Sequence, residues 1–89
     1  MAKKLRRILR RIKIKWMRSD RAWGYAEAEK WTIHLDDRMD DKTLIEIATH
    51  ETGHVVLPMV DESAVDLLGK QVADVLTRLG FSRNHEGVR

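Results

Sequence analysis

The chain has 89 residues and no cysteine, and its 17 lysines and arginines outnumber its 14 aspartates and glutamates. A chain of this length forms one small domain, here predicted to span residues 1–89. The lack of cysteine excludes disulfides, thiolate metal sites, iron–sulfur clusters and cysteine nucleophiles. No stretch approaches the roughly 20 apolar residues of a membrane span, and Lys and Arg interrupt the apolar residues near the N-terminus, unlike in a signal peptide. We therefore expect a soluble, cytoplasmic protein whose metal sites use only histidine and carboxylate ligands.

The positive charge is concentrated at the N-terminus. Residues 1–18 contain nine basic residues and no acidic one, whereas residues 19–89 contain eight basic and fourteen acidic residues, a net charge of −6. A cationic leader of this kind, about residues 1–11, can contact nucleic acid or an anionic surface. The alternative is a solvated terminus without a partner. Nucleic acid bound through residues 1–18 is thus one of two interpretations of this segment.

Alternating apolar and polar residues predict three strands in the first half of the chain. A strand over about residues 11–17 alternates isoleucine and tryptophan with lysine, and a strand over residues 31–35 alternates tryptophan, isoleucine and leucine with polar residues. Residues 23–26 look like the partner of the latter, with a turn near residues 28–30. We expect three short antiparallel strands.

Helical spacing replaces this alternation further along the chain. Asp40 or Asp41 can cap the N-terminus of a first helix, where a carboxylate is also favoured by the helix dipole. This helix should end by about Leu57, because Pro58 restricts the conformation of the residue before it. After a short loop, Asp61 is the expected cap of a second helix.

The second helix should end at Gly80, a residue suited to the position after a helix C-terminus, with Phe81 able to touch Leu76. Its predicted buried stripe has seven members: Ala64, Val65, Leu68, Val72, Val75, Leu76 and Leu79. Three strands followed by two helices predict an α+β fold. We expect the first helix to lie on the sheet and the second to pack beside it.

The first predicted helix contains the sequence H-E-T-G-H. His50 and His54 are four residues apart, so on a helix they point the same way, about 5–6 Å apart at Cβ, and can share one zinc ion. Glu51 lies one step around the helix, where its carboxylate can hold a water and accept its proton. The alternative, a polar helix face in water, leaves Gly53 unexplained, because glycine inside a helix costs about 1 kcal/mol relative to alanine. We expect a strand or a substrate to approach closely at Gly53.

A catalytic zinc ion held by two histidines needs a third protein ligand. Glu62 starts the second helix just after the turn at Pro58, and this turn should bring it near His54. Asp66 lies four residues further along on the same side, where it can accept a hydrogen bond from the second ring N–H of a ligating imidazole. Without a metal, Glu62 would be an ordinary acid in a first helical turn and Asp66 a solvated polar residue.

The motifs H-E-T-G-H and E-S-A-V-D together resemble those of the gluzincin metallopeptidases, which carry HExxH on one helix and ExxxD on the next. The short chain is similar to minimal gluzincins and to small zincin-like proteins found in phage genomes, over about residues 40–81. The resemblance implies a zincin-like α+β fold, a zinc-dependent peptidase and a sheet edge that holds a peptide or protein substrate. The residues matching the three Zn2+ ligands, the general base and the acid that orients a histidine are, in that order, His50, His54, Glu62, Glu51 and Asp66.

Two differences from the large thermolysin-like enzymes support a competing hypothesis. The interval between His54 and Glu62 is shorter here, and the substrate-clamping domain is absent. The chain can therefore also be interpreted as a zincin-scaffold binding module, non-catalytic or latent until a partner completes it, and associated with nucleic acid through its basic N-terminus. A peptidase also needs a group that stabilises the oxyanion opposite the metal. The candidates, among which the sequence does not choose, are Tyr25, His34, Arg83 and His85.

Overall fold

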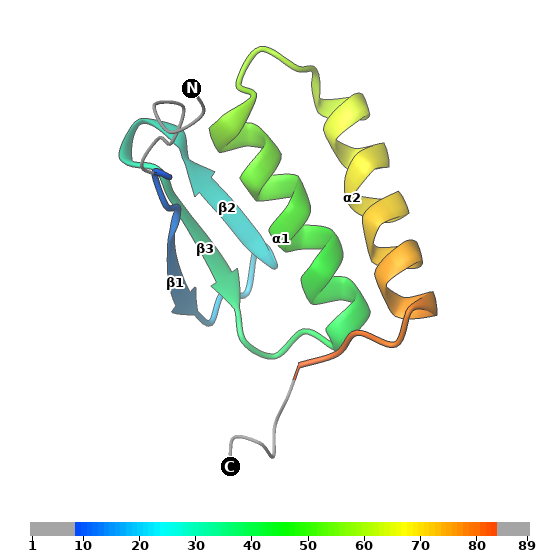
Figure 1. Cartoon of the computed structure of the whole chain (residues 1–89). Coiled ribbons are helices and arrows are strands. Elements are labelled where there is room, and N and C mark those ends of the chain that lie inside the picture. The colour runs from blue at the N-terminus through cyan, green and yellow to red at the C-terminus, as the bar shows by residue number, and fades with distance from the viewer. Residues whose placement is uncertain (1–8, 84–89) are drawn as a thin grey trace.

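The computed structural model describes residues 9–83. In chain order its elements are β1 (Lys13–Met17), β2 (Gly24–Glu27), the short 3-10 helix η2 (Ala28–Lys30), β3 (Thr32–Asp36), α1 (Asp41–Val56) and α2 (Glu62–Arg78). Helix α1 lies along one face of the sheet, and α2 packs on α1 on the side away from the strands (Figure 1). The predicted α+β class, with three strands followed by two helices, is confirmed. Among residues 9–83, neither helix combines the length and the apolar composition needed to cross a membrane.

The sheet is mixed, so the prediction of three antiparallel strands was wrong for β1. The strand order is β1-β3-β2, with β1 parallel to β3 and β2 antiparallel to it. The chain reverses direction after β1 and again at η2, as predicted, but β3 inserts between the two earlier strands. Two reversals make β1 and β3 point the same way, and this insertion makes them neighbours. The central place goes to the most buried strand, in which Ile33 and Leu35 are each only 2% exposed.

The core lies between the sheet and α1. Ile33 and Leu35 of β3 pack with Met39 and Val55, and α1 adds partly buried apolar residues such as Ile47. Helix and sheet approach closely at Gly24 of β2, where a Cβ atom would lie 2.8 Å from Ile47 Cγ2. Helix α1 is therefore fixed against β2 and β3, and this contact sets the position of every side chain that α1 carries.

Both helices begin and end as the sequence predicts. The side chain of Asp40 accepts a hydrogen bond from the Thr43 amide at 2.8 Å, and that of Asp61 accepts one from Ala64 at 2.9 Å. Two backbone hydrogen bonds close the C-terminus of α2. The Gly80 amide donates to Thr77 O and the Phe81 amide to Leu76 O, both at 3.0 Å. This is the Schellman pattern, and it requires Gly80 to take a positive φ, here 90°.

The predicted buried stripe of α2 is only partly buried. Leu68, Val75 and Leu79 are 46%, 41% and 66% exposed. Val65 of the predicted stripe is buried, and the other buried residues of α2 are Gly69 and Ala73, so that the three are spaced four apart. Small residues at this spacing bring two helix backbones close together, whereas leucines would hold them apart. We call the line of contact through these three residues the seam. Because α1 contacts only this narrow strip of α2, the neighbouring side of α2 stays accessible.

One buried acid ties the loop after β1 to the end of β3. Asp36 is 0% exposed, and its carboxylate accepts hydrogen bonds from the Ser19 amide at 3.0 Å and from the Arg38 guanidinium at 2.6 and 2.9 Å. The Arg38 guanidinium holds the pKa of the Asp36 carboxyl well below its usual range, against the opposing effect of burial. The charged pair is thus part of the frame of the sheet.

Candidate metal centre

His50 and His54 lie one turn apart on α1 and point to the same side of the helix. Their ring centroids are 4.8 Å apart in an edge-to-face arrangement. Their side chains are 12% and 30% exposed, so the rings are shielded without being sealed from solvent. The spacing alone accounts for this pairing, because residues i and i+4 share one helix face.

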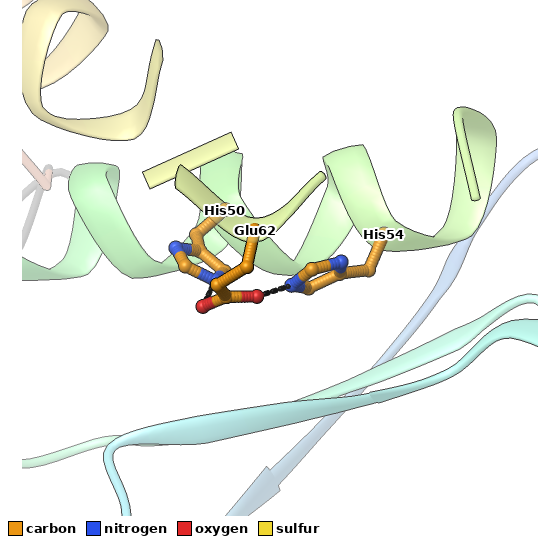
Figure 2. A group of neighbouring side chains, drawn as sticks. All are labelled: His50, His54 and Glu62. Atoms are coloured by element: carbon orange, nitrogen blue, oxygen red, sulfur yellow. Dashed lines mark ion pairs between the residues drawn. The ribbon is translucent and has the colours of Figure 1, made fainter. Parts of the chain in front are cut away.

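The third member of the group comes from α2. The chain leaves α1 at Leu57, turns through a hydrogen bond from the Val60 amide to Leu57 O at 3.0 Å, and starts α2 at Glu62. Glu62 Oε2 lies 3.0 Å from His50 Nε2, and Glu62 Oε1 lies 2.8 Å from His54 Nε2. Figure 2 shows the carboxylate spanning the two rings, with one oxygen toward each. The structure therefore brings His50, His54 and Glu62 to a common point.

This donor set suits a divalent cation such as zinc. One ligand atom from each of the three residues lies within 4.8 Å of the other two. In a tetrahedral zinc site with Zn–N distances of about 2.0–2.1 Å, ligand atoms are roughly 3.3 Å apart. The two contacts between Glu62 and the histidines, 3.0 and 2.8 Å, are close to that spacing. Two imidazoles and one carboxylate are also the three-ligand set of catalytic rather than closed structural zinc sites. Glu62 is 69% exposed, which leaves an open side toward solvent.

Glu51 is on the part of α1 that turns toward the sheet. It follows Ile47 and precedes Val55 by four residues each, and both of those residues pack in or against the core. Its side chain is half-buried, and burial raises the pKa of the Glu51 carboxyl, while the charges of His50 and His54 oppose this rise. A carboxyl group in such surroundings is a stronger base than one in water.

Asp66 lies near the group without a hydrogen bond to it. Its Oδ1 atom is 3.6 Å from His50 Nδ1, just beyond bonding distance, on the ring edge opposite the atom that faces Glu62. The carboxylate is held by Lys70 Nζ at 3.0 and 3.1 Å, and the same ammonium binds Glu46 of α1 at 3.1 Å. Sequence reasoning missed Lys70 and Glu46. The four-residue spacing of Asp66 and Lys70 was a signal for half of this bridge.

The glycine inside the HExxH motif is explained by the second helix. A Cβ atom on Gly53 would lie 3.0 Å from Cγ1 of Val65 in α2. The expectation of a close approach was correct, but the approaching element is a helix and not a strand or a substrate. Close packing at Gly53 keeps the start of α2, and with it Glu62, against the histidine-bearing turn of α1.

The oxyanion candidates that the structure describes lie away from the metal group. Tyr25 and His34 stand on the face of the sheet opposite α1, stacked on each other with ring centroids 4.2 Å apart. Arg83 binds the Asp41 carboxylate at 2.9 Å and Met39 O at 2.6 Å, at the start of α1. His85 lies outside the described residues. Tyr25 and His34 share this face because they are partners in register, and alternation along β3 turns Ile33 and Leu35, rather than His34, toward α1.

Comparisons with protein-family models, with curated proteins and with solved structures find no match to this chain. The resemblance to gluzincins therefore depends on the two helical motifs and on the way their residues meet. In this chain those residues are a pair of histidines one turn apart and a glutamate from the following helix that lies within 3.0 Å of both.

Proposed function

We propose that this protein is a zinc-dependent metallopeptidase of the minimal gluzincin type. The observation that carries the proposal is the convergence of His50 Nε2, His54 Nε2 and both Glu62 oxygens within 3.0 Å contacts. Two imidazoles and a carboxylate at one point, open to solvent on one side, favour a cation that needs a fourth ligand from outside the protein. Zn2+ suits this donor set, because histidine nitrogen and carboxylate oxygen are both among its usual ligands.

The surrounding residues suit hydrolysis of a peptide bond. Bound Zn2+ would acidify water and polarise a carbonyl group. Glu51, beside both histidines and with a raised pKa, is the residue that we assign to hold the attacking water and take its proton. Asp66, facing the far ring edge of His50, would fix the tautomer that leaves Nε2 free to bind the metal.

The edge strand β2 offers a place for the substrate backbone. Among residues 9–83 it pairs only with β3, and it lies alongside α1 (Figure 1). An extended peptide can add to such an edge through main-chain hydrogen bonds, with its side chains alternating between the two faces. We propose that a peptide substrate lies along β2, so that its carbonyl groups pass near the histidine-bearing side of α1.

Metal content and hydrolysis test the proposal together. Native mass spectrometry of the full chain should show one zinc ion per chain, lost on addition of a chelator. Glu51→Gln should retain this zinc while hydrolysis of a mixed peptide library falls by about 100- to 10,000-fold, the usual loss when a general base is removed. Glu29→Gln, an exposed glutamate of η2, is the matched control and should keep full activity.

Failure to bind zinc would refute the site, and full activity of Glu51→Gln would remove Glu51 from its role. Stoichiometric zinc with no hydrolysis by the wild type would favour the second candidate, a non-catalytic or latent zincin-scaffold binding module. The position of Tyr25, His34 and Arg83 away from the metal group is the observation that favours this candidate. A latent enzyme would gain the oxyanion-stabilising group from a partner protein.

A further inference from the structure

The sheet has a second face, opposite α1, on which basic and aromatic side chains lie side by side. The strand register places Lys15 of β1, His34 of β3 and Tyr25 of β2 in one row across this face. Lys13, two residues before Lys15 on β1, points to the same side. The residues that alternate with them, such as Ile33, pack toward α1. We call the row Lys13, Lys15, His34 and Tyr25 the open face.

The two lysines of the open face differ from most other cations of the described chain. Both are exposed, and no carboxylate of residues 9–83 lies within ion-pair distance of either. Cations later in the chain, such as Arg38 and Lys70, are bound to carboxylates at 2.6–3.1 Å. In addition, the first 18 residues contain no acid at all. Unpaired positive charge gathered on one strand attracts a polyanion.

Tyr25 presents a flat ring that is already held in place. It stacks on His34 with an interplanar angle of 10°, and His34 Nε2 is fixed 2.7 Å from Glu27 Oε1. Tyr25 remains 47% exposed. The Glu27 carboxylate on this face contacts His34, and its charge is offset by Lys30, whose ammonium is 3.6 Å away. One side of the tyrosine ring is thus supported by protein, while the other is free to receive a planar group.

The basic and aromatic surface continues past the start of β2. Trp23, which directly precedes this strand, is 47% exposed. It lines a surface hollow of about 420 Å3 together with Arg21, Arg38 and the connecting residues 19, 20 and 22. The Trp23 ring and the Arg21 guanidinium are therefore available beside the open face, whereas the Arg38 guanidinium is held by Asp36. The only acid in the lining is Asp20.

We propose that the open face binds single-stranded nucleic acid, with a base stacked on Tyr25 and phosphates contacted by Lys13 and Lys15. An exposed ring takes a base only when that base is unpaired, which favours a single strand over a duplex. Backbone contacts through lysine are independent of sequence, so little base preference is expected. This function goes beyond the proposed peptidase, because the open face and the metal group lie on different sides of the sheet.

Binding of a fluorescein-labelled oligo-dT of 12 nucleotides to the full chain, followed by anisotropy, tests this inference. Tyr25→Leu should weaken binding roughly 5- to 100-fold, whereas Tyr25→Phe should keep it, because only the ring is needed. Lys13→Ala and Lys15→Ala should each reduce the slope of log affinity against log salt by about 0.7. Trp16→Leu and Lys42→Ala are the matched controls and should bind like wild type. Trp16 is 54% exposed on the other face of the same sheet, and Lys42 is an exposed lysine of α1.

Thermal melts of every variant separate lost binding from lost folding, and Tyr25→Phe guards against a folding defect at this position. The inference is overturned if Tyr25→Leu is folded and binds like wild type, since the attraction would then be ionic only. Equal or tighter binding of a 12-base-pair duplex, or of heparin, would likewise overturn it. If Trp16→Leu lost as much oligonucleotide affinity as Tyr25→Leu, the binding site would not be the open face, and the inference would be overturned.

Discussion

In the helix pair, most charged side chains meet partners, whereas the two lysines of the open face do not. Lys70 lies between Glu46 and Asp66, Arg78 binds Asp74, and one carboxylate reaches two histidines. Lys13 and Lys15 stand exposed, with no acid near them in residues 9–83. Both regions belong to the same small domain and are separated by one layer of sheet.

This difference between paired and unpaired charges indicates which surfaces bind external partners. A charge that is paired inside the fold positions an element or holds a site. A row of like charges without partners gains little for the fold and is explained by something outside it. The metal group combines both properties, because its ligands contact each other while one side stays open to solvent. Substitutions at paired and at unpaired groups should therefore have different effects on stability and binding.

The largest effect should come from removing one ligand of the metal group. We expect His54→Ala to lower zinc affinity by more than about 100-fold, since loss of a ligand costs more than loss of a residue that orients one. The matched control is His34→Ala, which removes the partly buried histidine of the open face and should leave zinc affinity unchanged. Competition with a chromophoric chelator measures both. Equal zinc affinity in His54→Ala and wild type would remove the metal site from the helix pair.

Removing a charge that is paired inside the frame should lower stability in a pH-dependent way. Because the pKa of Asp36 is depressed in the folded state, its stabilisation is complete above the ordinary value of 3.8 and is lost as pH falls below it. Asp36→Asn should therefore lower the urea midpoint at pH 7, and the gap to wild type should narrow toward pH 3. A gap that is constant between these pH values would show that the carboxylate charge does not matter.

Two glycines lie where α1 and α2 pack together, and they should differ in their tolerance of an added methyl group: Gly69 should tolerate it poorly and Gly53 well. A Cβ atom on Gly69 would lie 2.7 Å from the backbone oxygen of Glu46, which cannot move aside. We expect Gly69→Ala to lower the free energy of unfolding by about 1–2 kcal/mol, despite the better helix propensity of alanine. At Gly53 the neighbour is a Val65 methyl group at 3.0 Å, so Gly53→Ala should stay within about 1 kcal/mol of wild type. Urea unfolding in chelator measures both, and the reverse order would contradict the packing.

Replacing Asp66, which faces the far ring edge of His50, should lower zinc affinity less than replacing a metal ligand. Asp66→Asn leaves the ring without a charged neighbour at Nδ1 and should reduce zinc affinity about 10-fold. Asp74→Asn removes another paired acid from the same helix, eight residues further on, and serves as the control. The same chelator competition applies. A similar loss in both variants would point to the charge of the helix as a whole rather than to the position of Asp66.

The smallest effect on stability should come from the open face. Lys13→Ala and Lys15→Ala remove charges that have no partner in residues 9–83, so the free energy of unfolding should change by less than about 0.5 kcal/mol. The same variants should clearly weaken nucleic-acid binding. A large loss of stability would mean that these lysines serve the fold, and the contrast between the two regions would not hold.

Features that depend on neighbours in the chain could be predicted from the sequence alone. Both aspartate caps, the end of α1 before Pro58 and the Gly80 terminus all follow from the chemistry of a few consecutive residues. The alignment of His50 with His54 has the same origin, because helix geometry fixes the relation of residues four apart. His50 and His54 thus needed only local rules, whereas Glu62 reaches them through the turn at Pro58 and the packing of α2 on α1 at Gly53.

What the tertiary structure alone decided concerns residues far apart in the chain. The insertion of β3 between β1 and β2 made β1 parallel to β3. The packing of α1 on the face that carries Ile33 and Leu35 left Tyr25 and His34 on the face away from the metal group. The seam through Val65, Gly69 and Ala73 left the expected stripe of α2 partly exposed and joined Lys70 to Glu46. Hydrophobic periodicity states which residues prefer burial, but it does not state which partner buries them, because that choice is made by the competition of all elements for one small core.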